Sequence, residues 1–380
     1  MKYFIIAGEA SGDLHGSNLV KGIFAADPAA EIFCWGGDLM EKAGAKLLMH
    51  YRRNAFMGFL TVLLHLPSVI RNLKLCKKQI AGLRPDAVIL IDYPGFNLRI
   101  ARYAANSGLN VLYYISPKLW AWNESRVKVI KKYVNRMYII FPFEEEFYRK
   151  HGIKVKYYGN PLTDEIEKFM NSLHSGRNGI SSIKSEDARN RIIALVPGSR
   201  IHEVNHILPE MLKIVPLFPE HTFIITAAPN IPPSVYRKLT GELPVRTEYD
   251  RTYEILSASE AALVKSGTST LEAALLGVPQ VVCYKSDPVS FFIARRLVKV
   301  KYISLVNLIL GREAVRELIQ HLLTRENLFA SLGKIMPGGI ERERLMKDYE
   351  EIKQILGPAG ASARIASEMV TYINEKRRNA

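Results

Sequence analysis

The sequence predicts an α/β protein built from two doubly wound halves, each with a parallel sheet. Short, almost continuous apolar runs alternate with helical patterns along the 380 residues, as is typical of parallel strands buried on both faces. A stretch rich in Ser, Gly, Asn and charge, 172–191, interrupts this order. The strand, glycine turn and helix pattern then restarts at "RIIALVPGSRIHEV". We expect domains at 1–168 and 187–340 that face a cleft, and a helix at about 360–380 that packs back or swaps.

Composition narrows the class of protein. The chain is 48% hydrophobic and 23% charged, with a net charge of +15, which indicates anionic partners or simply a basic enzyme. We do not expect nucleic acid binding, because no recognised motif accompanies the charge. Three scattered cysteines without CxxC spacing favour a reducing compartment and argue against a zinc site. We expect neither a signal peptide nor a membrane span, because the longest apolar stretch, 55–70, is short of the roughly 20 residues required.

The elements follow in order along the chain. The predicted strands lie within 2–8, 31–37, 86–92, 110–116, 136–141, 155–160, 191–199, 222–228, 261–267 and 279–284. Helical patterns lie between them. One example is 97–108, whose apolar residues share a face and which ends at Gly108. The last stretch, 363–379, predicts an amphipathic helix with a basic end.

The first glycine turn, "AGEASGDLHGSNL" at 7–19, resembles a phosphate cradle. Its two acids, Glu9 and Asp13, would repel a diphosphate, whereas acids suit a sugar alcohol. Glycines such as Gly12 allow the backbone to approach a sugar closely. We therefore predict an acceptor site here that includes Ser11, Gly12 and Asp13.

Asp92 ends a buried strand in "LIDYPGFN". Ligands of open α/β sheets bind at the carboxyl ends of strands, so Asp92 is the first candidate for a general base, and Glu9 is the second. A structural acid that caps the turn is the alternative for Asp92. Asn97 and Trp122 are further candidate acceptor contacts, and Trp122 could equally lie at a membrane-facing edge or in the core.

An apolar run beside basic residues predicts a peripheral membrane patch. A buried helix with a solvated basic face fits the same pattern equally well. The candidate membrane residues are Phe56, Met57, Phe59, Leu60, Leu63 and Leu64.

The second half carries the turns better suited to a nucleotide. Gly198, Ser199 and Arg200 stand between a strand and a helix, where backbone N–H groups and a guanidinium attract phosphate. Ser266, Gly267 and Thr268 form a second such turn. Glu272, one helical turn later, is placed to accept the hydroxyls of a ribose. Ordinary turns and a solvated helix acid are the alternatives. Further polar candidates on the donor side are Glu203, Asn307, Glu317 and Gln320.

Together the motifs identify a family. "GEASGDLHG", "IDYPGFN", "SPKLWAW", "FPFEEEFY", "LVPGSRIHEV", "SGTSTLEAALLGVPQVVCY" and "SLVNLILGREAVRELIQ" occur in that order. Over roughly residues 1–325 the chain closely resembles the lipid-A-disaccharide synthases, which are inverting glycosyltransferases of the GT-B type with two Rossmann-like domains.

The resemblance implies a reaction and its partners. A UDP-2,3-diacylglucosamine would donate its sugar to the 6-hydroxyl of 2,3-diacylglucosamine 1-phosphate and form a β-1′,6-linked disaccharide. It implies no cofactor and no metal, UDP binding in the second half, and Asp92 as the base. Family members work at the cytoplasmic face of the inner membrane and can form homodimers.

Two other functions fit parts of the pattern. A UDP-GlcNAc 2-epimerase-like isomerase would share the UDP site but would need no acyl-binding surface. A basic membrane- or RNA-binding protein with a degenerate cleft would show steeply salt-dependent RNA binding.

Overall fold

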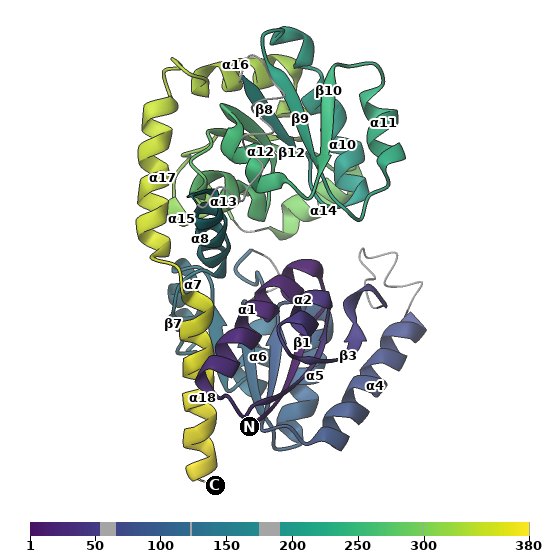
Figure 1. Ribbon diagram of the computed structural model, residues 1–380, viewed down its shortest axis with the longest axis vertical. Coiled ribbons are helices and arrows are strands. Elements are labelled where there is room, and N and C mark those ends of the chain that lie inside the picture. Colours follow the sequence, from purple (N-terminus) through teal and green to yellow (C-terminus); the bar gives the residue numbers. More distant parts are fainter. Residues whose placement is uncertain (54–65, 122–123, 175–190, 299, 380) are drawn as a thin grey trace. The chain divides into compact units, whose positions relative to one another are not determined.

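A computed structural model describes residues 1–53, 66–121, 124–174, 191–298 and 300–379 (Figure 1). The chain divides into two compact units. The first comprises Met1–Asp164 and Pro358–Ala380, and the second comprises Glu165–Gly357. Each unit holds one sheet in which all strand pairs are parallel. The predicted α/β class with two doubly wound sheets is therefore confirmed.

The sheet of the first unit has the strand order β3-β2-β1-β4-β5-β6-β7. Its strands are β1 (Lys2–Ala7), β2 (Glu31–Gly36), β3 (Lys46–His50), β4 (Ala87–Ile91), β5 (Asn110–Tyr114), β6 (Arg136–Ile139) and β7 (Lys156–Tyr157). The central strands are buried on both faces, which explains why their sequences are continuous apolar runs.

Helices cover both faces of this sheet. The helices of this unit are α1 (Ala10–Ala26), α2 (Asp38–Lys42), α4 (Leu66–Leu83), α5 (Pro94–Asn106), α6 (Val127–Tyr133), α7 (Phe143–Lys150) and α18 (Ala361–Arg378), with short 3₁₀ turns η1 (Tyr51–Arg53) and η2 (Glu124–Arg126). Helix α8 (Pro161–His174) begins in this unit and continues into the second. Helices α1, α2 and α18 share one core cluster with the sheet, and α4, α5, α6 and α7 share the other.

The last helix, α18, packs against the first one. A Cβ added at Gly22 of α1 would lie 2.7 Å from the Cβ of Ala366, so a glycine is needed at this crossing. Asp164 caps α18, because its carboxylate accepts hydrogen bonds from the backbone of Gly360, Ala361 and Ser362 at 2.6–3.0 Å. The C-terminal helix thus belongs to the first unit.

The sheet of the second unit has the order β10-β9-β8-β11-β12-β13. Its strands are β8 (Ile192–Val196), β9 (Thr222–Ala227), β10 (Val245–Tyr249), β11 (Ala261–Lys265), β12 (Gln280–Tyr284) and β13 (Glu317–Ile319). Its helices are α10 (Ile201–Leu212), α11 (Pro233–Thr240), α12 (Thr252–Ala258), α13 (Thr268–Leu275), α14 (Pro288–Leu297), α15 (Leu305–Leu310), α16 (Arg325–Ile335) and α17 (Arg342–Leu356), with η3 (Val215–Leu217) and η4 (Gln320–Leu322).

Both sheets have a topological switch point. In the first unit the chain runs from β1 outward to β3 and then resumes at β4 on the other side of β1. In the second unit it runs from β8 to β10 and resumes at β11 on the other side of β8. Open α/β sheets bind ligands at the carboxyl ends of the strands at such points. The loops after β1, β4, β8 and β11 are therefore expected to form the ligand-binding sites of the two units.

Among the described residues, no helix combines the length and the apolar character needed to cross a bilayer. The predicted membrane residues Phe56, Met57, Phe59, Leu60, Leu63 and Leu64 lie outside the described residues, as does Trp122.

Candidate functional site

Asp92 directly follows β4 at the switch point of the first unit. It and Tyr93 both have left-handed backbones, with φ of 44° and 49°, a conformation that non-glycine residues adopt only when their surroundings impose it. Three hydrogen bonds impose it here: the Asp92 N–H donates to the Tyr114 carbonyl (3.0 Å), and its carbonyl accepts from the Tyr113 hydroxyl (2.6 Å) and the Asn97 amide (2.8 Å). The Asp92 carboxylate takes part in none of these three bonds.

The turn after β1 lies beside the turn after β4. Ala7 pairs with Ile91 in the parallel ladder, and a Cβ added at Gly8 would lie 2.4 Å from the Tyr93 ring. A side chain at position 8 would therefore displace Tyr93 and with it the turn that holds Asp92. Glu9 comes next, at the N-cap position of α1, so the two candidate bases stand at adjacent strand ends.

The Asp92 carboxyl has a raised pKa. Burial, together with the negative charge of Glu9, raises this pKa to about 6, against opposing effects of the Lys118 ammonium and the Tyr93 backbone N–H. Both causes of the rise disfavour the ionised form. At neutral pH the group is ionised and basic enough to take a proton.

The other predicted acceptor residues have different surroundings. Ser11 is exposed on the first turn of α1. Gly12 is buried, and a Cβ there would lie 3.2 Å from the Cβ of Ala7, so this glycine allows α1 to pack closely on β1. Asn97 is fully buried, and its side-chain amide donates hydrogen bonds to the backbone carbonyls of Ile91 and Asp92. Their direct contact with an acceptor stays a prediction.

Asp13 is buried in a structural role. Its carboxylate accepts hydrogen bonds from the backbone N–H groups of Gly37, Leu39 and Met40 at 2.8–3.1 Å, at the start of α2. An anion at a helix N-terminus is favourable. Both oxygens are engaged in the fold, so the predicted contact of Asp13 with an acceptor hydroxyl stays a prediction.

Sequence reasoning missed Glu144, which lies next to this edge of the sheet. Its buried carboxylate accepts hydrogen bonds from the backbone of Phe141 and Ile140 and from Trp120 Nε1. Burial raises the pKa of Glu144 to about 7. Glu144 thereby ties the loop after β5 to the loop after β6, and its signal in the sequence was the acid-rich "FPFEEEFY".

At the switch point of the second unit, two turns lie at neighbouring strand ends. Gly198, with a φ of +112°, Ser199 and Arg200 join β8 to α10. Ser266 and Gly267 join β11 to α13, whose first residue, Thr268, is exposed. The Ser266 hydroxyl donates to the Ile303 carbonyl at 2.7 Å. An unpredicted ion pair connects the start of α10 to the end of β11: Lys265 Nζ lies 2.9 Å from Glu203 Oε1.

Glu272 lies one turn into α13, as the sequence predicted. The Tyr253 hydroxyl donates to its Oε1 at 3.1 Å. Burial raises the pKa of the Glu272 carboxyl, against opposing hydrogen bonds from Tyr253 and Ser269. A half-buried carboxylate offers about four acceptor sites, so Glu272 retains capacity for a further donor beside Tyr253 and Ser269.

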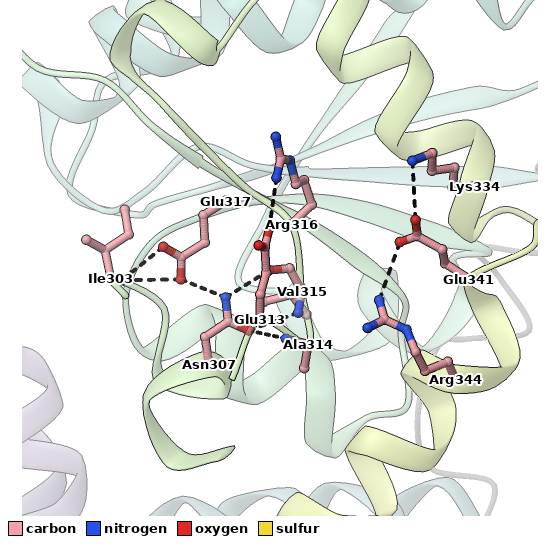
Figure 2. Close-up of polar contacts among 10 residues, drawn as sticks. All are labelled: Ile303, Asn307, Glu313, Ala314, Val315, Arg316, Glu317, Lys334, Glu341 and Arg344. Atoms are coloured by element: carbon pink, nitrogen blue, oxygen red, sulfur yellow. Dashed lines mark hydrogen bonds and ion pairs between the residues drawn. The ribbon is translucent and has the colours of Figure 1, made fainter. Parts of the chain in front are cut away.

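Asn307 and Glu317 form a closed network (Figure 2). The fully buried Asn307 accepts from the backbone N–H groups of Ala314 and Val315 and donates to the Val315 carbonyl and to Glu317, all at 2.8–2.9 Å. Glu317 also accepts from the backbone of Ile303 and Ser304. Both side chains thus hold the segment 303–315, and their predicted contact with a donor stays a prediction.

Gln320 makes a reciprocal pair with Ser286. Its side-chain oxygen accepts from the Ser286 N–H (3.0 Å), and its amide donates to the Ser286 carbonyl (3.1 Å). The backbone of Gln320 is left-handed, with a φ of 53°. Gln320 therefore fixes the loop after β12, and its predicted donor contact also stays a prediction.

A cavity of about 460 Å³ lies at the amino ends of β12 and β13. Its charged residues are already paired, Arg316 with Glu313, and Lys334 and Arg344 with Glu341 (Figure 2). None of the predicted donor residues lines it. The cavity therefore lies at the amino ends of the strands, whereas open α/β sheets bind their ligands at the carboxyl ends.

Comparison with known proteins gives consistent matches. The family model described as lipid-A-disaccharide synthetase matches residues 3–364. The lipid-A-disaccharide synthase of Trichlorobacter lovleyi is 36% identical over 98% of both chains. That of Geobacter metallireducens is 35% identical over 99% of this chain and 98% of its own. That of Myxococcus xanthus is 35% identical over 98% and 97%.

Solved structures share the fold at low identity. UDP-GlcNAc 2-epimerase from Neisseria meningitidis, bound to UDP-GlcNAc, has a TM-score of 0.66 at 14% identity and covers 98% of this chain and 100% of its own. The calicheamicin glycosyltransferase CalG4 has a TM-score of 0.60 at 14% identity and covers 98% of each chain. These likenesses establish the two-sheet architecture only.

Proposed function

The chain belongs to the lipid-A-disaccharide synthase family, and we propose that it joins two acylated glucosamine units. As a member of this family it is a glycosyltransferase. The proposed donor is UDP-2,3-diacylglucosamine, and the proposed acceptor is 2,3-diacylglucosamine 1-phosphate. The products would be the β-1′,6-linked disaccharide 1-phosphate and UDP.

The placement of Asp92 is the observation that supports the role proposed for the acceptor substrate. Its carboxylate stands at the switch point of the first sheet with a pKa raised to about 6. In the proposed step Asp92 takes the proton of the acceptor 6-hydroxyl while that oxygen bonds to the anomeric carbon of the donor. The bond from this carbon to the diphosphate breaks, and UDP leaves with the electron pair. A single displacement of this kind inverts the anomeric configuration.

The donor half would be the switch point of the second sheet. Arg200 and the N-termini of α10 and α13 would attract the diphosphate. Glu272 would accept the ribose hydroxyls. Preorganised positive groups of this kind stabilise the charge that develops on a leaving diphosphate.

The substrates also imply a location. We place the enzyme peripherally at the cytoplasmic face of the inner membrane, as a homodimer, where the acyl chains of both substrates reside. The net charge of +15 and the apolar run of the segment 55–66 support contact with an acidic lipid surface. No observation favours the epimerase alternative beyond a shared fold at 14% identity.

The test is product analysis with short-chain diacylated donor and acceptor. We expect one UDP released per disaccharide monophosphate formed, as followed by mass spectrometry. The same protein given UDP-GlcNAc alone should form no UDP-ManNAc. Formation of UDP-ManNAc, or failure to release UDP from the acylated pair, would contradict the proposal.

A charge change near Asp92 should shift the pH profile of kcat/KM. The rate should fall about tenfold per pH unit below about 6, because protonated Asp92 is no base. Lys118 lowers the Asp92 pKa and Glu9 raises it. Lys118→Met should therefore move the acid limb to higher pH, and Glu9→Gln should move it to lower pH.

The matched control is Lys128→Met, which removes the same charge from an exposed site on α6. Its acid limb should coincide with that of the wild type. Shifts of the same sign in Lys118→Met and Glu9→Gln would rule out Asp92 as the titrating group.

A further inference from the structure

One carboxylate stands between two cations at the switch point of the second sheet. Glu203, the third residue of α10, lies 2.9 Å from Lys265 Nζ and 3.6 Å from an Arg200 guanidinium nitrogen, in both cases through Oε1. The Glu203 side chain is 11% exposed and that of Lys265 is 20% exposed. Arg200 belongs to the turn after β8, and Lys265 is the last residue of β11. The ion pair therefore spans the two strands between which the topology reverses.

The Glu203 carboxylate rests against the glycine turn itself. A Cβ added at Gly198 would lie 2.6 Å from Glu203 Oε2. The Lys265 ammonium lies against the other turn, 3.6 Å from where a Cβ of Gly267 would stand. The Glu203 carboxylate thus already stands beside the first turn, paired with a cation that lies against the second, where an incoming diphosphate would meet N–H groups and cations.

We propose that Lys265 binds the diphosphate of the sugar donor together with Arg200, and that Glu203 is the counter-ion that holds Lys265 while the site is empty. This inference rests on the proposed UDP-sugar donor. It gives Glu203 a positioning role in place of the direct donor contact predicted from the sequence.

Charge and side-chain geometry support this exchange of partners. Two cations and one carboxylate leave the cluster with one positive charge, and a diphosphate brings more negative charge than Glu203 does. The lysine ammonium is a compact charge on a flexible stem, so it can turn from the carboxylate to a phosphate oxygen without a change in the backbone. As the bond from the anomeric carbon to the diphosphate breaks, Lys265 would stabilise the charge that grows on the leaving oxygen.

Binding of UDP and of uridine, measured by calorimetry, tests the role of Lys265. Lys265→Met should weaken UDP binding about tenfold, or about 1.4 kcal/mol, and leave uridine binding unchanged, because uridine carries no phosphate. Lys265→Arg should retain most of the UDP affinity. The control Lys238→Met removes a charge from the exposed face of α11 and should change neither affinity.

Glu203→Gln separates the two roles of that residue. As a counter-ion, Glu203 competes with the diphosphate, so its neutral replacement should tighten UDP binding about threefold. Weakened UDP binding would make Glu203 a donor ligand and overturn the counter-ion role. The double variant Lys265→Met/Glu203→Gln leaves no buried unpaired charge, and it should still bind UDP about tenfold more weakly than Glu203→Gln does.

The outcomes distinguish this inference from the function on which it rests. A wild-type protein that binds no UDP would contradict the proposed function. Wild-type UDP binding together with unchanged UDP affinity in both Lys265→Met and the double variant would overturn only the role of Lys265. Thermal unfolding of each variant, with a midpoint close to that of the wild type, verifies that the binding is measured on folded protein.

Discussion

Replacement of Asp92 by Asn is expected to lower the turnover number about a thousandfold, within the range that a general base contributes. Asparagine has nearly the same shape as aspartate but cannot accept a proton from the acceptor hydroxyl. The turn itself should survive, because its three hydrogen bonds all use the backbone of residue 92: the N–H donates to the Tyr114 carbonyl, and the carbonyl accepts from Tyr113 and Asn97. UDP affinity should stay within about twofold of the wild type, since the proposed donor residues lie in the other unit.

The measurement is a single-turnover rate with the short-chain substrates, together with UDP titration. Glu9→Gln is the comparison, because Glu9 is the second candidate base and follows the adjacent strand. If Asp92→Asn turned over near the wild-type rate while Glu9→Gln lost most of its activity, Glu9 would be the base.

Replacement of Asn307 by Ala is expected to lower the free energy of unfolding by about 3–4 kcal/mol, since buried hydrogen-bonding groups left without partners cost roughly 1–3 kcal/mol each. The change leaves the N–H groups of Ala314 and Val315, one carbonyl and one Glu317 oxygen without their amide partner. UDP affinity of the folded fraction should change far less than stability does, because Asn307 is fully buried.

Urea denaturation, followed by far-ultraviolet circular dichroism, measures the free energy of unfolding of each variant. Asn327→Ala is the matched control: its amide makes one bond, to the Leu322 carbonyl, so it should cost about 1 kcal/mol or less. An Asn307→Ala protein with wild-type stability and much weaker UDP binding would restore Asn307 as the donor ligand that the sequence predicted.

The hydrophobic pattern of the sequence predicted the buried central strands but missed most of the edge strands. Each predicted strand range contains a strand, whereas β3, β10 and β13 were not predicted, and all three lie at sheet edges. A central parallel strand is apolar on both faces, so its run stands out. An edge strand is short and partly solvated, as the half-buried "VRTEY" of β10 shows, and its composition does not separate it from a loop.

The sequence alone determined the fold class, the family, and the positions of Asp92 and Glu272 at strand ends and helix starts. These features depend on local periodicity and on motifs whose residues are close together in the chain. Only the tertiary structure decided which polar side chains are already engaged: Asp13 with the start of α2, Asn307 with Glu317, and Lys265 with Glu203. Residues from separate elements form each of these contacts, 10 to 62 positions apart, and they meet only because the strands pair and the helices pack.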